Sequence, residues 1–253
     1  MAPRLQVCLV RDPRSGECSA VGSALGLAGH SVTEVHALAG TEERDAAREA
    51  NLVIIDSDDP EWVTGCVDKL EPLTRPKQMV LHTCLAVGVQ ALDEVEVRGA
   101  VTMAAHPIVP NCWVTSAADE LGEATLALLV GEMHGMNVPI DDALRPHLVA
   151  AARIMALSST GSRDGLELIG AALPEAGAAL APYTDAAEMT PVVALDPAHL
   201  ERANSAIADP SLARFHAELE RREAERTHNA DVQLWATATI STKVSTKDST
   251  KEQ

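Results

Sequence analysis

The sequence predicts an α/β fold in which a mostly parallel sheet is followed by an all-helical second domain. Two patterns support this prediction. In the first 115 residues, short and nearly continuous apolar runs alternate with helical stretches. This pattern is typical of parallel strands that are covered by helices on both faces of the sheet. From Ala117 onward strand signals nearly vanish, and helical segments separated by prolines follow one another.

The elements are expected in the following order. Strands are predicted at 5–10, 31–38, 52–56, 79–82 and 100–105, with helices between them. The second domain is predicted to hold helices at 117–134, 141–157, 164–181, 197–208 and 210–228. Because Ser241 to Gln253 repeats Ser, Thr and Lys without apolar periodicity, the end of the chain is predicted to be disordered. The predicted domains are 1–138 for the sheet, 139–230 for the helices and 231–253 for the tail.

Composition excludes several classes of function. The 253 residues carry a formal net charge of -17, and a field of that sign repels nucleic-acid backbones and anionic lipids. Aromatic residues make up only 2% of the chain, so stacking platforms for single-stranded nucleic acid are nearly absent. We therefore expect a small-molecule substrate, with neither a nucleic acid nor a membrane as a partner.

Cysteine usage and hydropathy bear on the compartment. The chain has five cysteines without the spacing of a disulfide framework, which favours reduced thiols in a cytoplasmic protein. No apolar run approaches the about 20 residues that a membrane span needs. A cytoplasmic location is the expectation.

The turn after the first strand is where a Rossmann-type sheet would hold a dinucleotide pyrophosphate. The usual Gly-x-Gly-x-x-Gly pattern falls here on Pro13, Ser15 and Cys18, with Gly16 close by. One interpretation is a variant phosphate loop that uses a helix N-terminus around 15–17 as donor. The other is the loss of the site, because proline lacks an N–H and Glu17 places a negative charge where the phosphate would lie.

Two further strand ends contribute candidate cofactor contacts. The second strand ends without the usual ribose-binding acid, and Arg11 lies nearby, which favours NADP over NAD. After the third strand, Ser57 and Asp58 lie where they can line the cleft. The acidic residues before Pro60 also fit a simple helix N-cap.

Histidines follow the fourth and fifth strands. His82 and Thr83 follow one apolar run and His106 follows the next, so each is expected at the carboxyl edge of the sheet, where such folds bind ligands. Together with Cys84 and Cys112, the two histidines have ligand types that zinc accepts, but no short ligand pair fixes the geometry. Metal binding and a hydrogen-bonded histidine pair both stay open.

The order of these segments resembles a family of bacterial predicted oxidoreductases. In that family a Rossmann-like domain precedes a helical domain similar to the C-terminal part of 6-phosphogluconate dehydrogenase. The matching segments are Ala28-Gly29-His30, Leu52–Asp56, His82-Thr83, Arg98-Gly99-Ala100 with His106-Pro107, and Arg145-Pro146-His147 with Ala150-Ala151-Ala152. They extend over about residues 5–157 and fade beyond. The departures are the replaced glycines, Cys84 and Leu85 in place of Ser-Gly, and Met155 in place of an asparagine.

The resemblance implies a reaction and an assembly. Some relatives act in pantothenate biosynthesis as ketopantoate reductases, which implies NADP and a small 2-oxo or 2-hydroxy acid as substrate. His106 or His147 is then the candidate for protonating the developing alkoxide. The resemblance also implies a homodimer formed through the helical domain. The rival hypothesis is a non-catalytic Rossmann-like binding or scaffold protein that has lost the cofactor site, since a fold does not carry function by itself.

Overall fold

The chain forms two compact units, which are described separately. The computed structural model describes residues 4–15, 19–173 and 192–248. The first unit is Met1–Arg145 and the second is Pro146–Gln253. The boundary lies later than the expected 138, because residues 136–139 add a strand to the sheet. Arg145 is also bound within the first unit, where its guanidinium donates to the Leu85 carbonyl and the Ser116 hydroxyl.

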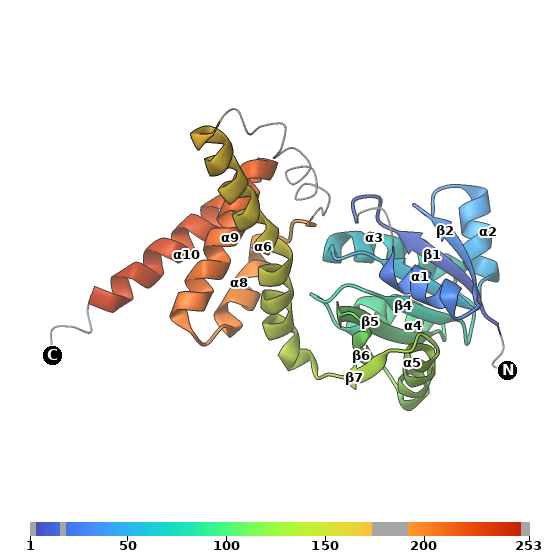
Figure 1. Cartoon of the computed structure of the whole chain (residues 1–253). Coiled ribbons are helices and arrows are strands. Elements are labelled where there is room, and N and C mark those ends of the chain that lie inside the picture. Colours follow the sequence, from blue (N-terminus) through green and yellow to red (C-terminus); the bar gives the residue numbers. More distant parts are fainter. Residues whose placement is uncertain (1–3, 16–18, 174–191, 249–253) are drawn as a thin grey trace. The chain divides into compact units, whose positions relative to one another are not determined.

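The first unit is built on a seven-stranded sheet, shown at the right of Figure 1. The strand order is β2-β1-β3-β4-β5-β6-β7, and every neighbouring pair is parallel except β5 and β6. The predicted mostly parallel sheet is confirmed. The strands are β1 (Gln6–Arg11), β2 (Ser31–Val35), β3 (Leu52–Asp56), β4 (Met79–His82), β5 (Val101–Val109), β6 (Cys112–Ala117) and β7 (Met136–Pro139).

Strands β6 and β7 were not predicted from the sequence, and β5 is longer than predicted. Strand β5 continues through Pro107, where the pairing with β6 shifts register, and prolines are tolerated in strands at such irregularities. Asn111 has a φ of 59°, a backbone conformation that asparagine tolerates better than most residues, and it turns the chain back into β6. The antiparallel pair was hidden because Pro107 and Pro110 look like strand breakers.

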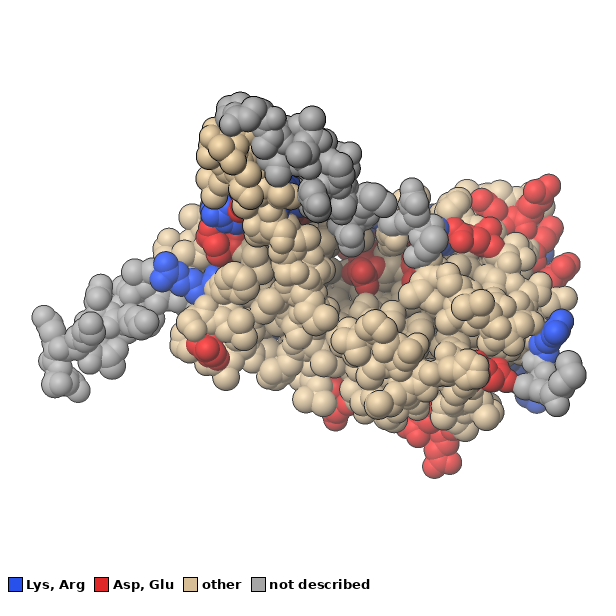
Figure 2. Space-filling model, viewed as in Figure 1, with Lys and Arg blue, Asp and Glu red and all other residues tan. Residues whose placement is uncertain are grey.

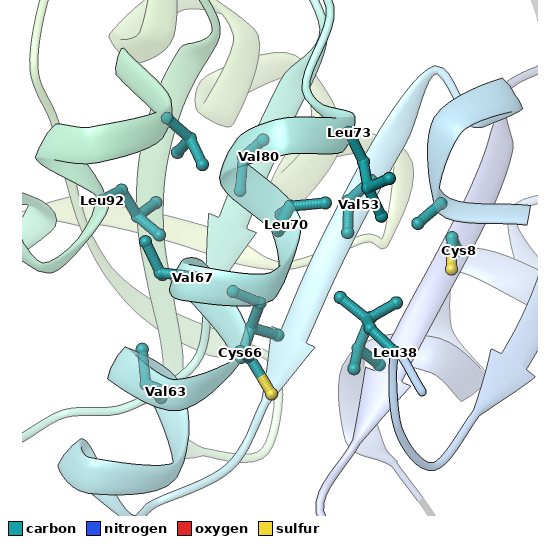
Figure 3. Close-up of a cluster of buried hydrophobic side chains, with 14 of the residues drawn as sticks. Cys8, Leu38, Val53, Val63, Cys66, Val67, Leu70, Leu73, Val80 and Leu92 are labelled. Carbon is teal, nitrogen blue, oxygen red and sulfur yellow. The ribbon is translucent and has the colours of Figure 1, made fainter. Parts of the chain in front are cut away.

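Helices cover both faces of the sheet. They are α1 (Ala20–Leu27), α2 (Thr41–Glu49), α3 (Pro60–Leu70), α4 (Asp93–Val97) and α5 (Glu120–Glu132). Figure 3 shows the cluster in which Val63, Val67 and Leu70 of α3 pack against Val53 and Val80 of the sheet. On the opposite face, α1 and α5 cover a second buried cluster. The near-continuous apolar strands follow from this double covering, since both faces of each central strand are buried.

The second unit is helical, as predicted. Its described helices are α6 (Arg145–Ala172), α8 (Pro197–Ala206), α9 (Pro210–Thr227) and α10 (Ala230–Asp248). Helices α8 and α9 each begin with proline after an aspartate N-cap, which explains why their starts were predictable.

Two expectations for the second unit were wrong. The expected break between 157 and 164 does not occur, because α6 runs continuously through Gly161. The expected tail from 231 is instead helix through Asp248, since α10 packs along α9 and tertiary contact outweighs a weak local pattern. The rest of the expected helix at 164–181 beyond residue 173, and residues 249–253 of the tail, lie outside the described residues.

Charge and hydropathy of the structure agree with the acidic composition. Figure 2 shows acidic side chains gathered over α2, where Glu42, Asp45 and Glu49 are exposed. A search of the described helices finds none with the length and apolar character needed to cross a membrane.

Candidate functional site

The candidate site is the carboxyl edge of the sheet in the first unit. Strand β1 has β2 on one side and β3 on the other, so the chain leaves β1 in one direction and later returns to its opposite side. Ligands of open α/β sheets bind in the crevice at such a switch point. Here the loops after β1, β3 and β4 meet through a network of polar side chains.

The network centres on Asp12, the residue after β1. Its side chain is fully buried. One carboxylate oxygen accepts from the Arg14 backbone N–H at 2.9 Å and from Arg14 Nε at 3.0 Å. The other accepts from Arg14 Nη2 and from the Ser57 hydroxyl, both at 2.8 Å. Asp12 therefore holds Arg14 in a two-pronged ion pair and is itself held by Ser57.

These bonds keep Asp12 ionised despite its burial. Burial opposes the charged form, but the hydrogen bonds from Arg14 and Ser57 outweigh it and hold the pKa of Asp12 below its ordinary value. The same hydrogen bond to Asp12 is the main cause that raises the pKa of Arg14, against some desolvation. A buried anion thus lies directly before Pro13, the position at which a standard phosphate loop has its first glycine.

Arg14 also reaches the loop after β3. Its Nη2 lies 2.7 Å from Oδ2 of Asp59, while the Arg14 side chain remains 56% exposed. Oδ1 of Asp59 caps α3 by accepting from the backbone N–H groups of Glu61 and Trp62. Arg14 consequently links the loops on the two sides of the switch point and presents a cation to solvent. Arg14 was not among the residues predicted from the sequence.

Ser57 and Thr83 connect β3 to β4. The Ser57 backbone N–H donates to the Thr83 hydroxyl at 3.1 Å, and that hydroxyl donates to Asp56 at 2.8 Å. Both predicted residues are buried, and their side chains fix the loops. The predicted neighbour Asp58 is 60% exposed and lies at the surface of the same edge.

His106 has the geometry of a usable acid or base. Its Nδ1 lies 2.7 Å from the Thr83 carbonyl, which only accepts, so Nδ1 carries the proton. Nδ1 also lies 3.7 Å from an Asp58 oxygen. Within the described ranges, no hydrogen-bond partner contacts Nε2, and the side chain is 17% exposed. The ring is therefore oriented at one nitrogen and available at the other.

His82 lies differently, although it also ends a strand. It is completely buried, and its Nε2 donates to the Gly88 carbonyl at 3.0 Å. Burial lowers its pKa to about 4, so the ring is neutral. The prediction that His82 contacts the cofactor does not agree with this burial, and the residue instead holds the loop that contains Gly88.

The histidine and cysteine quartet does not form a metal centre. Burial raises the pKa of Cys84 to about 12, which disfavours the thiolate that a metal needs, and its Sγ faces the Asp58 carbonyl at 3.4 Å. In the part of the chain that the structure describes, no three or more possible ligands (His, Cys, Asp, Glu) are grouped so that they could hold a metal ion. His82, moreover, is turned toward Gly88.

The predicted phosphate loop differs from expectation. Pro13 and Ser15 lie in a turn closed by the Ser15 N–H and the Asp12 carbonyl, whereas Gly16 and Cys18 lie outside the described residues. Helix α1 begins at Ala20 and not around 15–17, because Ser19 accepts from the Gly22 N–H as N-cap. A Cβ at Gly22 would lie 2.6 Å from Leu9 Cδ2. Gly22 therefore allows the close packing of α1 on β1 for which the usual pattern has a glycine at the position of Cys18.

Arg11 is held at the end of β1. Its Nη1 lies 2.8 Å from Oε1 of Glu34, a residue of β2. No acid was expected at the end of the second strand, and Glu34 of β2 is the carboxylate that pairs with Arg11. The register of β1 and β2 would have indicated this contact, because Glu34 pairs with Leu9, two residues before Arg11.

His147, the other candidate acid, belongs to the second unit. It is exposed on the first turns of α6. Met155 is 55% exposed on the same helix.

Comparisons with known proteins agree with this two-part organisation. Residues 141–239 match the family model of the 6-phosphogluconate dehydrogenase C-terminal domain-like proteins. The matched residues include most of the second unit. The resemblance found in the sequence is thereby confirmed for the helical part of the chain. A search of curated proteins gave no match.

Solved structures extend the likeness to the whole chain. A Bacteroides fragilis protein described as an NADP oxidoreductase has a TM-score of 0.51 at 13% identity, covering 93% of this chain and 96% of its own. The prephenate dehydrogenase of A. aeolicus, solved with hydroxyphenyl propionate and NAD+, has a TM-score of 0.50 at 11% identity, covering 99% of this chain and 89% of its own. At such identities the likeness establishes a shared fold.

Proposed function

We propose that the protein is an oxidoreductase that uses NADP on a small 2-oxo or 2-hydroxy acid. The single observation that carries the proposal is the strand-end network, which presents an exposed Arg14 guanidinium and the free edge of His106 at the switch point of the sheet. The family match and the names of the two similar structures support the reaction class.

The residues fit a dinucleotide through side chains, without a glycine cradle. Arg14 is the cation for the diphosphate, and it is already fixed in orientation by Asp12. Arg11 lies at the carboxyl end of β1, near the region where such folds recognise a 2′-phosphate. Glu34 would compete with that phosphate for the Arg11 guanidinium. Ser57 and Thr83 keep the loops in place beneath.

The residues of the chain contribute proton transfer to and from the substrate. The cofactor would supply or accept the hydride. His106 has its Nδ1 proton fixed on the Thr83 carbonyl, so Nε2 is the atom that exchanges a proton with the substrate oxygen. His147 is the second candidate for this role. A homodimer through the helical unit and a ketopantoate-like substrate belong to the same proposal.

A titration with NADPH and NADH by calorimetry tests the proposal. We expect NADPH to bind more tightly than NADH. The variant His106→Gln should bind NADPH as the parent does but lose turnover by a factor of about 100 or more. Absence of binding by either nucleotide at millimolar concentration would refute the proposal.

A second candidate function rests on the buried Asp12 carboxylate. A fixed anion at the start of the phosphate loop is what a cofactor-free binding protein with this fold would tolerate and an enzyme would have to offset. This alternative predicts no nucleotide response in the same titration.

A further inference from the structure

We infer that Arg14 is the anion-recognising residue of this site, and that Asp59 is its internal competitor for a phosphate or diphosphate ester. The inference rests on the proposed function and deepens it, because it names the carboxylate that an anionic ligand must displace from Arg14. The two acidic partners of the Arg14 guanidinium hold it unequally, with two bonds to Asp12 and one to Asp59.

The contact with Asp12 is permanent. It consists of three hydrogen bonds from Arg14 to a carboxylate with no exposed surface, and breaking it would leave that charge buried without its cation. Asp12 therefore holds the Arg14 side chain in one orientation. This preorganisation reduces the conformational entropy that Arg14 would otherwise lose when it binds an anion.

The contact with Asp59 is replaceable. It is a single hydrogen bond of 2.7 Å from Nη2 of Arg14 to Oδ2 of Asp59. The Arg14 side chain is half-exposed, and that of Asp59 is 16% exposed. Oδ1 of Asp59 is engaged in capping α3, so Oδ2 can release Arg14 without loss of the cap. Among the described residues no acceptor contacts Nη1 of Arg14, so its N–H groups remain available to a ligand.

Charge decides the direction of the competition. Asp58 and Asp59 both lie at this edge, and both oppose an anionic ligand. A ligand with one negative charge gains little by exchanging with Asp59. A phosphate or diphosphate ester offers several acceptor oxygens and more charge to the planar guanidinium, which binds such groups in a two-pronged geometry.

The experiment uses calorimetric titration of the full chain with inorganic pyrophosphate and, separately, with NADPH. The variant Asp59→Asn keeps the α3 cap but removes the competing charge. The variant Arg14→Gln removes the cation. Matched controls are Asp45→Asn and Arg48→Gln, which remove the same charges from the exposed Arg48–Asp45 ion pair on α2. Circular dichroism verifies that each variant is folded.

We expect Asp59→Asn to bind pyrophosphate about threefold more tightly than the parent, since an exposed ion pair of this kind is weak. Arg14→Gln should weaken binding by about tenfold or more. The two controls should change it by less than Asp59→Asn does. If Arg14→Gln does not fold, the Asp59→Asn result alone decides.

The outcomes separate this inference from the proposed function. Unchanged or weaker pyrophosphate binding in Asp59→Asn overturns the inference, as does absence of pyrophosphate binding in both the parent and that variant. NADPH binding that Arg14→Gln leaves intact also overturns it, while the proposed function stands. Pyrophosphate binding through Arg14 without any NADPH binding refutes the proposed function and supports the anion site.

Discussion

The two units bury polar groups in opposite ways. In the sheet unit the interior of the central strand β3 is apolar, with Val53, Ile54 and Ile55 fully buried, and the buried polar groups of the site gather at the carboxyl edge. In the helical unit, charged and polar side chains lie in the interior itself. They are Arg153, Thr160, Arg163, Asn204, His216, Glu220 and Glu223.

The difference follows from how each unit is built. Helices cover both faces of the central strands, so the side chains on each face pack in an apolar cluster. In the helical unit, Arg153 donates to both oxygens of Glu220 at 2.7 and 2.6 Å and to the Val193 carbonyl at 2.6 Å. This arginine thereby joins α6 to α9 and to the segment before α8. The core of the sheet unit consists of apolar contacts. The interior of the helical unit also contains specific hydrogen bonds and ion pairs between buried charged groups.

The largest expected effect is therefore in the helical unit. Arg153→Met leaves Glu220 buried without its cation, so we expect a loss of about 3–5 kcal/mol in the free energy of unfolding. Arg222→Met, at a half-exposed arginine paired with Asp164, is the control and should cost at most about 1 kcal/mol. Urea unfolding followed by circular dichroism measures both. Equal effects would mean that the buried Arg153–Glu220 pair contributes no more to the stability of the helical unit than a half-exposed pair does.

The next effect is pH dependence in the sheet unit. The folded pKa of His82 is about 4 against an ordinary value of 6.5, so the unfolded chain takes up the proton first as pH falls. His82 thus contributes stability in full above about pH 6.5 that is lost progressively toward pH 4, by about 3 kcal/mol. His82→Gln keeps a donor for the Gly88 carbonyl and should lack this part of the slope. An identical slope in urea midpoints of parent and variant would contradict the prediction.

A smaller effect is expected where α1 packs on β1. A Cβ at Gly22 would lie 2.6 Å from Leu9 Cδ2, so Gly22→Ala should cost about 1–3 kcal/mol. Gly26→Ala in the same helix has no atom within 4 Å of the added Cβ and should stabilise by about 0.5–1 kcal/mol. Opposite signs in thermal unfolding would establish that close packing, and not helix propensity, requires glycine at 22.

The smallest effect should be the same in both units. Gly161→Ala on α6 also adds a Cβ with no atom within 4 Å, so it should stabilise by about 0.5–1 kcal/mol, as Gly26→Ala does. Hydrogen exchange of the flanking amides measures the local gain in each helix. A destabilising result at 161 would mean that the unequal packing of the units extends even to their exposed helix positions.

Much of the candidate site follows from the strand pattern. Ser57, Thr83 and His106 were placed at one edge because the carboxyl ends of parallel strands meet there, and their hydrogen bonds bring them together. The pattern did not distinguish His82 from His106. Strand β4 ends at His82, which turns inward, whereas β5 continues past His106 to Val109 and leaves that ring at the edge.

The sequence by itself determined where the central strands lie along the chain, the double covering of the sheet and the helical character of the second unit. These properties are local, because they depend on apolar periodicity and on caps such as Asp196 and Asp209 that act within a few residues. Only the tertiary structure decided that Arg14 joins Asp12 to Asp59, that Glu34 pairs with Arg11, and that α10 is helical. Long-range pairing sets these features, since an ion pair between residues far apart in the chain leaves no periodic trace in the sequence.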